Sequence, residues 1–398
     1  MCYAISLPPA VLLLMERLEK EGFSAHAVGG CVRDSLLGRP VHDWDLTTSA
    51  TPEEMKGVFA DFRTIDTGVR HGTLTVACEG MPYEITTYRT DGAYTDSRHP
   101  DSVTFTRSLS EDLARRDFTV NAMAYSPRDG IVDPFGGRED LSLRTLRAVG
   151  DPTCRFTEDA LRILRALRFS SVLGFSVEEG TAAAVLALYP RLSAVSAERI
   201  CQESAKLLTG AHAASVLAAY APVFYAVWPY IGRESLGSES LAAFDRLPSD
   251  LSLRLSALCQ AEDPDTLASA LLQARFSKHF AVSVSATVRA LGAYPCDRAT
   301  LRALCSALGT EPCRDAAILM GVRDPMGADT VLSALSEDEK NGMPLHPSDL
   351  ALSGEDLARL GVPRGAQMGA AFRALLLAVW QDRVPNDPAS LAAFLTNT

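Results

Sequence analysis

The sequence predicts an α+β fold in which a mixed-sheet head is followed by an all-helical body. Up to about residue 140, short β-branched and apolar runs alternate with Gly- and Pro-containing turns and short helical segments. Beyond that point, Leu-, Ala- and Arg-rich helical periodicity continues to the end, and few β-branched runs remain. The length of 398 residues is enough for two or three domains.

The elements of the head can be assigned in order from their local signals. Strands are expected at residues 24–30, 42–48, 63–68, 72–80 and 81–90. Helices are expected at residues 8–21, 31–39 and 51–62. Thr51 is the expected N-cap of the third helix, with Pro52 in its first position. The last two strands are joined by a Glu79-Gly80 turn of the hairpin type.

Composition and cysteine usage indicate a cytoplasmic protein. The chain is 47% hydrophobic and 22% charged, and no apolar run reaches the roughly 18 residues that a membrane span needs. The N-terminal apolar run has no basic start and continues into charged helical sequence, which argues against a signal peptide. Nine cysteines without C-x-x-C pairs argue for a reduced protein that has no structural zinc site.

The net charge of −11 argues against a protein that binds nucleic acid over its whole surface. The charge is unevenly distributed, because residues 141–170 carry six arginines against three acids and are therefore +3. Since the local field depends on charges within about a Debye length, such a strip can still hold a phosphate backbone.

Asp43 and Asp45 form a D-x-D pattern within the strand expected at 42–48. Residues i and i+2 of a strand face the same side, so the two carboxylates lie close together and raise each other's pKa. A cation or a proton between them would explain the pair. The alternative is two surface aspartates beside a turn.

The segment GGCVRDSLLGR, residues 29–39, precedes the D-x-D pattern by one short helix. Gly29 and Gly30 allow backbone N–H groups to approach a phosphate, and Arg33 adds a cation in the first helical turn. A phosphate cradle next to a carboxylate pair suits Mg²⁺-dependent phosphoryl transfer. Glu84 is the candidate third acid, the alternative being a glutamate on the solvent face of a hairpin edge.

Polar residues are also concentrated in LARRDFTVNAMAYS, residues 113–126. Asp117 and Asn121 precede an apolar stretch, and Asp117 is suited to accept from a ribose hydroxyl with Arg116 near the phosphates or ribose. The alternative is an N-cap with a surface salt bridge. The DPFGG sequence at residues 133–137 is expected to form a turn that closes the head.

The segment FTEDALRILRALRF, residues 156–169, predicts one amphipathic helix with Thr157 as its N-cap. Its polar stripe, spaced by three, consists of Asp159, Arg162, Arg165 and Arg168. Asp159 could accept from an exocyclic amine while Arg162 donates to a ring nitrogen. Cytosine and adenine offer that pattern, whereas uracil and guanine do not. The alternative is a solvated face with ion pairs.

These segments, in this order, resemble the motifs of the class II CCA-adding enzymes (tRNA nucleotidyltransferases) and of their bacterial poly(A) polymerase relatives. The resembling stretches are GGCVRDSLLGR with HDWDLTT, LARRDFTVNAMA, DPFGG, EDALRILRALRF and SAERICQES. The resemblance covers about residues 25–205, and the C-terminal sequence HPSDLALSGEDLARLGVPRGAQMGAAFRALLLAVW resembles the family's tail segment more loosely.

The resemblance implies a polymerase-beta-like nucleotidyltransferase head, followed by a helical neck, body and tail. The corresponding ranges are 1–140, 141–207, 208–325 and 326–398. It implies Asp43 and Asp45 as Mg²⁺ ligands. It implies nucleotide binding by Gly30, Arg33, Arg116, Asp159, Arg162, Arg165 and Arg168. The residue patterns add Gly29, Asp117 and Asn121 as candidate nucleotide-binding residues.

The implied reaction is attack of a tRNA 3′-hydroxyl on the α-phosphate of CTP or ATP, with release of pyrophosphate. The body and tail would hold the acceptor stem and elbow of the tRNA through its phosphates. No membrane contact and no obligate protein partner are expected.

The segment TDGAYTDSRHPDSV, residues 90–103, resembles the flexible loop with which full CCA enzymes switch from C to A. The candidate loop residues are Asp91, Gly92, Asp96 and Arg98. The loop disfavours a CC-adding specialist, while an A-adding specialist or a poly(A) polymerase stays open. A catalytically silent tRNA-binding protein is a further alternative, disfavoured by the intact Asp43 and Asp45.

Overall fold

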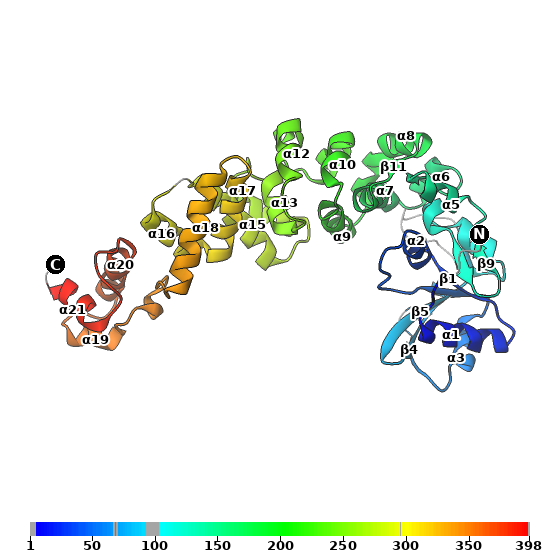
Figure 1. Ribbon diagram of the computed structural model, residues 1–398, viewed down its shortest axis with the longest axis horizontal. Coiled ribbons are helices and arrows are strands. Elements are labelled where there is room, and N and C mark those ends of the chain that lie inside the picture. The colour runs from blue at the N-terminus through cyan, green and yellow to red at the C-terminus, as the bar shows by residue number, and fades with distance from the viewer. Residues whose placement is uncertain (1–4, 67, 69–70, 93–102, 295, 397–398) are drawn as a thin grey trace. The chain divides into compact units, whose positions relative to one another are not determined.

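The structure is a computed structural model that describes residues 5–66, 68, 71–92, 103–294 and 296–396 (Figure 1). The chain forms two compact units. Unit 1 comprises Met1–Val216 and Pro222–Val227, and unit 2 comprises Leu217–Ala221 and Trp228–Thr398. The finer division into head, neck, body and tail remains a prediction.

A seven-stranded mixed sheet with the order β3-β4-β5-β2-β1-β8-β9 forms the centre of unit 1. The strands are β1 (Ala25–Val28), β2 (Leu46–Thr48), β3 (Arg63–Ile65), β4 (Thr73–Cys78), β5 (Met81–Thr87), β8 (Ala124–Ser126) and β9 (Gly130–Val132). β2 and β5 are parallel, with Leu46 opposite Ile85, and the other neighbours are antiparallel. A separate two-stranded ribbon is formed by β6 (Arg89–Asp91) and β7 (Val103–Phe105).

Three helices of the head lie where the sequence predicts them, and the helices at residues 109–114 and 137–142 were not predicted. The helices of the head are α1 (Pro9–Lys20), α2 (Gly30–Leu36), α3 (Pro52–Val58), α4 (Leu109–Ala114) and α5 (Gly137–Ser142), with the 3-10 turn η2 (Thr119–Asn121). α1 and α3 pack together beside β1 and β4 (Figure 1). α3 starts as expected: Thr51 and Glu54 form a reciprocal capping box after which Pro52 opens the helix. Glu79 and Gly80 both have positive φ, which fits the expected hairpin turn.

The second half of unit 1 is helical, as the periodicity predicts, apart from the short parallel pair β10 (Thr145–Leu146) and β11 (Ser176–Val177). Its helices are α6 (Pro152–Glu158), α7 (Leu161–Leu173), α8 (Glu179–Leu188), η3 (Tyr189–Ala194), α9 (Ala197–Leu208), α10 (Ala213–Ala219) and α11 (Ala221–Val227). α7 packs extensively on α9, with Leu164 and Leu167 fully buried.

Two local predictions were wrong. The strand expected at 42–48 begins only at Leu46, because residues 41–45 lack ladder pairing apart from the Asp45 carbonyl, which accepts from Val28 N (3.0 Å). The helix expected at 156–169 is two helices that meet at Asp159, whose φ of −139° leaves the helical region. Thr157 is therefore inside α6, and Asp151 is the N-cap of that helix.

Unit 2 is helical throughout its described residues. Its elements are η4 (Arg233–Leu236), α12 (Ser238–Phe244), α13 (Leu251–Leu258), α14 (Pro264–Gln273), α15 (Lys278–Gly292), α16 (Arg298–Leu308), α17 (Thr310–Gly321), α18 (Pro325–Lys340), η5 (Pro347–Asp349), α19 (Gly354–Arg359), α20 (Ala366–Trp380) and α21 (Pro388–Thr396). Buried Arg302 of α16 connects three helices, since it donates to Asp338 of α18 (2.8 Å) and to the carbonyl of Trp380 of α20 (2.6 Å).

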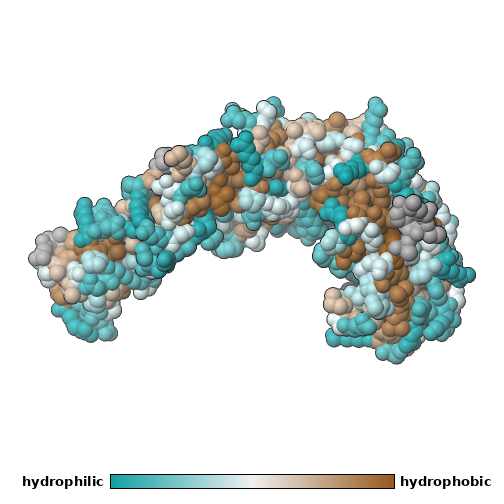
Figure 2. All heavy atoms as spheres, in the orientation of Figure 1, coloured by the Kyte–Doolittle hydropathy of each residue, from teal (hydrophilic) through white to brown (hydrophobic). Residues whose placement is uncertain are grey.

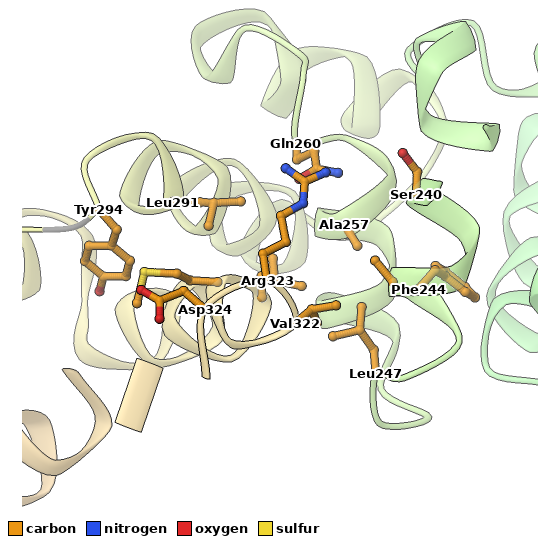
Figure 3. A pocket seen from close by; sticks show the side chains of 13 residues that line it. Ser240, Phe244, Leu247, Ala257, Gln260, Leu291, Tyr294, Val322, Arg323 and Asp324 are labelled. Atoms are coloured by element: carbon orange, nitrogen blue, oxygen red, sulfur yellow. The ribbon is translucent and has the colours of Figure 1, made fainter. Parts of the chain in front are cut away.

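A pocket of about 320 Å³ lies in unit 2 between α12, α13, α15 and α17 (Figure 3). Its walls are mainly apolar, with Phe244 and Leu247 on one side and Leu291 on another, and Arg323 extends beside Gln260. Apolar residues also reach the visible surface in the region of α15 and α17 (Figure 2).

None of the described helices is long and apolar enough to cross a membrane. The eight cysteines within the described ranges are all free thiols.

Candidate active site

The predicted catalytic carboxylates lie at the start of β2. Asp43 and Asp45 belong to the extended segment before this strand, and both side chains are exposed. The hydrogen bond from Val28 N to the Asp45 carbonyl continues the register in which Ala27 faces Leu46. The carboxylates therefore lie beside the end of β1, where the chain turns into Gly29 and Gly30.

Glu84 of β5 is the neighbour of Asp45 across the parallel β2–β5 pair, because Leu46 lies opposite Ile85. The pKa of Asp45 is raised, first by partial desolvation and then by the negative charges of Glu84 and Asp43, while Arg116 acts in the opposite direction. The three acids thus share one electrostatic environment. Glu84 is exposed and lies one residue before the β2–β5 pairing begins at Ile85, so its assignment as a third acid remains a prediction.

The donor set at this place fits a hard divalent cation. Asp43 and Asp45 are exposed and close enough for the charge of Asp43 to act on Asp45, and none of the ion pairs among the described residues involves either carboxylate. The described residues contain no cluster of three or more His, Cys, Asp or Glu side chains arranged around one metal position. Mg²⁺ keeps several water ligands and commonly takes one or two carboxylates together with substrate phosphates, so two protein ligands are sufficient.

Gly29 separates β1 from α2, which begins at Gly30, and Gly29 has the positive φ of 79°. A Cβ atom on Gly29 would lie 3.0 Å from Nη1 of Arg116, so any side chain there would displace this guanidinium. The N–H of Gly29 donates to the carbonyl of Met123 (3.1 Å) and is used within the fold. Glycine is therefore needed here for the close approach of Arg116.

A chain of polar contacts runs from α2 to α7. Arg33 is buried and donates from Nη1 to Oδ1 of Asn121 (2.6 Å), and Asn121 donates to Oδ1 of Asp117 (3.1 Å). Oδ2 of Asp117 accepts from Nε and Nη2 of Arg165 (2.8 and 2.6 Å). Burial would raise the pKa of Asp117, but Arg165 and the hydrogen bond from Asn121 outweigh it and lower the pKa to about 2. Asp117 is thus a buried anion, not the surface N-cap considered above.

The arginines of α7 gather around one aromatic ring. Nε of Arg168 donates to Oε2 of Glu203 on α9 (2.5 Å), and Arg165 lies 3.7 Å from the same carboxylate. The guanidinium carbons of Arg33, Arg165 and Arg168 lie 5.0, 5.5 and 3.8 Å from the ring centre of Phe169. The stripe on α7 is consequently not a solvated charged face, because Arg162 is buried and the other two arginines are half-buried.

Asp159 and Arg162 flank the start of α7. Oδ1 of Asp159 accepts from Leu161 N (3.0 Å), and both carboxylate oxygens accept from Arg199 of α9 (2.7 and 3.2 Å). Arg162 donates to Glu158 (2.6 Å) and to two backbone carbonyls. Arg162 N also donates to the Asp159 carbonyl (3.0 Å), which keeps the two residues adjacent despite the break between helices.

The candidate residues of the loop are only partly within the described residues. Asp96 and Arg98 lie outside the described residues. Asp91 belongs to β6, where it is paired with Val103, and Gly92 follows it.

Two residues next to the site were not predicted from the sequence: Phe169, which lies under three arginines, and Asp112, which is fully buried beside Arg116. The spacing of Asp112 four residues before Arg116 was the available signal.

A strand, a Gly-Gly turn and a short helix lead to an exposed carboxylate pair on a mixed sheet, and helices with an arginine-lined face follow. This arrangement places the chain among the nucleotidyltransferases with a polymerase-beta-like head. The profile of the poly A polymerase head domain matches residues 25–147, and that of the probable RNA and SrmB-binding site of polymerase A matches residues 174–220.

Comparison with individual proteins narrows the class to one family. The chain is 38% identical over 381 residues to the CCA-adding enzyme of Limosilactobacillus fermentum, covering 94% of this chain and 93% of that protein. It is 52% identical over 204 residues to the enzyme of Geobacillus thermodenitrificans, covering 51% of this chain and 50% of that protein. The crystal structure of the Bacillus stearothermophilus CCA-adding enzyme in complex with CTP has a TM-score of 0.83 and 32% identity, with 98% of both chains covered. The chain belongs to the family of CCA-adding enzymes, which are tRNA nucleotidyltransferases.

Proposed function

We propose that this chain adds C, C and A to the 3′ end of tRNA without a nucleic-acid template, using CTP and ATP and releasing pyrophosphate. The observation that carries the proposal is the position of Arg116 against Gly29, at the end of β1 beside the segment that contains Asp43 and Asp45. CTP in the complex of the Bacillus stearothermophilus relative supports CTP as a substrate.

Asp43 and Asp45 are the proposed ligands of a divalent cation, Mg²⁺ being the proposed ion, with Glu84 as a third acid. When bound, such a cation would be held by Asp43 and Asp45 and would supply Lewis-acid chemistry that makes a neighbouring hydroxyl a better nucleophile. The pKa of Asp45 is raised first by desolvation and then by the charges of Glu84 and Asp43, and a cation bound beside these acids would offset their repulsion.

Arg116 is the proposed triphosphate contact nearest the carboxylates. Its Nε is buried and has no hydrogen-bond partner among the described residues, and its Nη1 lies against Gly29. Arg33 and Asn121 would complete the floor of the nucleotide site, and Asp117 is the proposed acceptor for a ribose hydroxyl. In the reaction the tRNA 3′-oxygen forms a bond to the α-phosphorus while the bond to the β-phosphate breaks.

Asp159 and Arg162 are the proposed readers of the base. Both are held by protein partners in the ligand-free chain, Asp159 by Arg199 and Arg162 by Glu158. These partners pre-orient the carboxylate and the guanidinium, and an incoming base exchanges with part of their hydrogen bonds. A base with an amine beside an unprotonated ring nitrogen satisfies both groups, so C and A are accepted. Arg165 and Arg168 would add positive charge along the same helix.

The helical regions at 208–325 and 326–398 are proposed to hold the acceptor stem and elbow of the tRNA through phosphates. The location is proposed to be cytoplasmic, from the cysteine pattern of the sequence.

The test uses purified protein with Mg²⁺ and three tRNA transcripts, which end at the discriminator base, in C and in CC. Each transcript is supplied with CTP, ATP, UTP or GTP singly and with CTP plus ATP, and products are sized to single nucleotides. Addition of two C and one A followed by a stop supports the proposal.

Other outcomes select the alternatives. Addition of A alone to the CC-ended tRNA indicates an A-adding specialist, two C without A indicates a CC-adding specialist, and an unlimited A tail indicates a poly(A) polymerase. No product with retained tRNA binding indicates a catalytically silent tRNA-binding protein.

A further inference from the structure

Asp112 of α4 is a fully buried carboxylate, with no exposed surface, at the junction of three elements next to the proposed nucleotide site. Its Oδ1 accepts from Nε and Nη2 of Arg115 (3.0 and 2.8 Å), and its Oδ2 accepts from Nη2 of Arg116 (3.2 Å). The hydroxyl of Thr47 on β2 lies 3.4 Å from Oδ2 and shares its one proton with the nearer carbonyl of Thr86 (3.1 Å), and the N–H of Arg89, the first residue of β6, donates to Oδ1 (3.4 Å). One carboxylate therefore joins β2, β6 and α4.

Two guanidinium groups face the single carboxylate of Asp112, so one positive charge remains uncompensated next to the proposed nucleotide site. Burial would raise the pKa of Asp112, but the charges of Arg116 and Arg115 outweigh it and lower the pKa. One carboxylate cannot neutralise two guanidinium groups. Arg116 keeps a positive charge, a buried Nε without a described partner, and an Nη1 against Gly29. A triphosphate would pair with this positive charge and accept hydrogen bonds from these N–H groups.

Geometry explains why Arg116 needs such an anchor. Its side chain is only one fifth exposed, and a long flexible side chain loses rotamer entropy when it binds. Asp112 holds Nη2 of the guanidinium in advance and leaves Nη1 against Gly29. Asp112 is itself held in place, because the hydroxyl of Thr47 and the N–H of Arg89 that contact it belong to strands.

We propose that Asp112 is a positioning residue for nucleotide binding: it holds Arg116 beside Gly29 and the carboxylate pair, and it ties that arginine to the first residue of β6. This inference rests on the proposed function, since it takes Arg116 as a nucleotide contact. Asp112 does not touch the nucleotide and acts through Arg116.

The test is a double-mutant cycle in the full-length chain with Asp112→Asn, Arg116→Ala and the double variant. The measured quantities are the Kd of CTP in the presence of Mg²⁺ and the KM for CTP on the tRNA transcript that ends in C. Asn has no negative charge and only one acceptor oxygen for the two arginines, so Asp112→Asn is expected to raise both quantities about tenfold. The KM for the tRNA and the preference for CTP over UTP should stay unchanged, because the base is read from α7.

The decisive comparison is made in the Arg116→Ala background. If Asp112 acts through Arg116, the double variant binds CTP as weakly as Arg116→Ala alone. If the two effects multiply, or if Asp112→Asn binds CTP normally, the inference is overturned. Should Asp112→Asn not fold, as judged by circular dichroism, Asp112→Glu enters the same cycle, because one extra methylene shifts the carboxylate while its charge remains.

Arg115→Met is the matched control, because it breaks an ion pair with the same carboxylate (2.8 Å) without removing the contact to Arg116. It is expected to lower the melting temperature while the Kd of CTP stays unchanged. An equal loss of CTP binding in Arg115→Met would show that the effect of Asp112 is a general loss of structure. If the wild-type chain binds CTP but extends no tRNA, the proposed function fails while the binding cycle still tests Asp112.

Discussion

The substitution Asp159→Asn separates base reading from general nucleotide binding. In the structure Oδ1 of Asp159 accepts from Leu161 N and Oδ2 accepts from Arg199 at 2.7 Å. The asparagine amide oxygen can keep the bond to Leu161 N and so preserve the start of α7. Its NH₂ group then takes the place of Oδ2, and a donor faces the base where an acceptor was.

The size of the effect follows from that exchange. A hydrogen bond to a charged group contributes about 1.5–3 kcal/mol, which corresponds to about 10- to 150-fold in kcat/KM for CTP. Uracil presents a carbonyl at the same position and can accept from the new NH₂ group. We therefore expect the ratio of kcat/KM for CTP over UTP to fall by at least about tenfold.

The assay is incorporation of a single nucleotide into the tRNA transcript that ends in C, with CTP and UTP measured separately. Glu203→Gln is the matched control, since Glu203 is a similarly buried carboxylate that pairs with Arg168 on the same helix. It should weaken nucleotide binding without changing the CTP to UTP ratio. An unchanged ratio in an active Asp159→Asn variant, or an equal change in both variants, would refute the base-reading role.

Three further predictions address the metal, the loop and the pH dependence of stability. Asp45→Asn should abolish nucleotide transfer while filter binding of tRNA stays normal, and normal turnover would remove Asp45 from the metal site. Deletion of residues 92–99 should leave C addition intact and stop A addition on the CC-ended transcript; continued A addition contradicts the loop assignment. Asp117→Asn should lower the thermal stability at pH 7, where the wild-type carboxylate is charged and paired. Because the folded pKa of Asp117 is lowered to about 2, its stabilisation is complete above about pH 4 and is lost as the pH falls through 2. The difference in melting temperature between this variant and the wild type should therefore shrink over that range, and a constant difference would show that the charge of Asp117 is not what stabilises the fold.

Local features of the site could be predicted from the sequence because their causes are local. The capping box at Thr51 depends on residues three positions apart, and the turn at Glu79-Gly80 depends on two adjacent residues with positive φ. The order of the motifs also predicted the family, and the comparisons confirm it. Apolar periodicity was sufficient to place the helical half of the chain.

The predictions that failed depended on contacts distant in the sequence. The predicted helix is interrupted at Asp159, whose carboxylate accepts from Leu161 N at the start of α7 and pairs with Arg199, which lies 40 residues further along the chain. The burial of Asp117 requires Arg165, 48 residues away, since an unpaired carboxylate would not remain charged inside the protein. Residue types and spacing therefore indicated which side chains carry the chemistry. The packing of α4, α7 and α9 determines the ion-pair partners of these carboxylates. A buried charged group pairs with an oppositely charged group on the element that packs against it, and that element can be distant in the sequence.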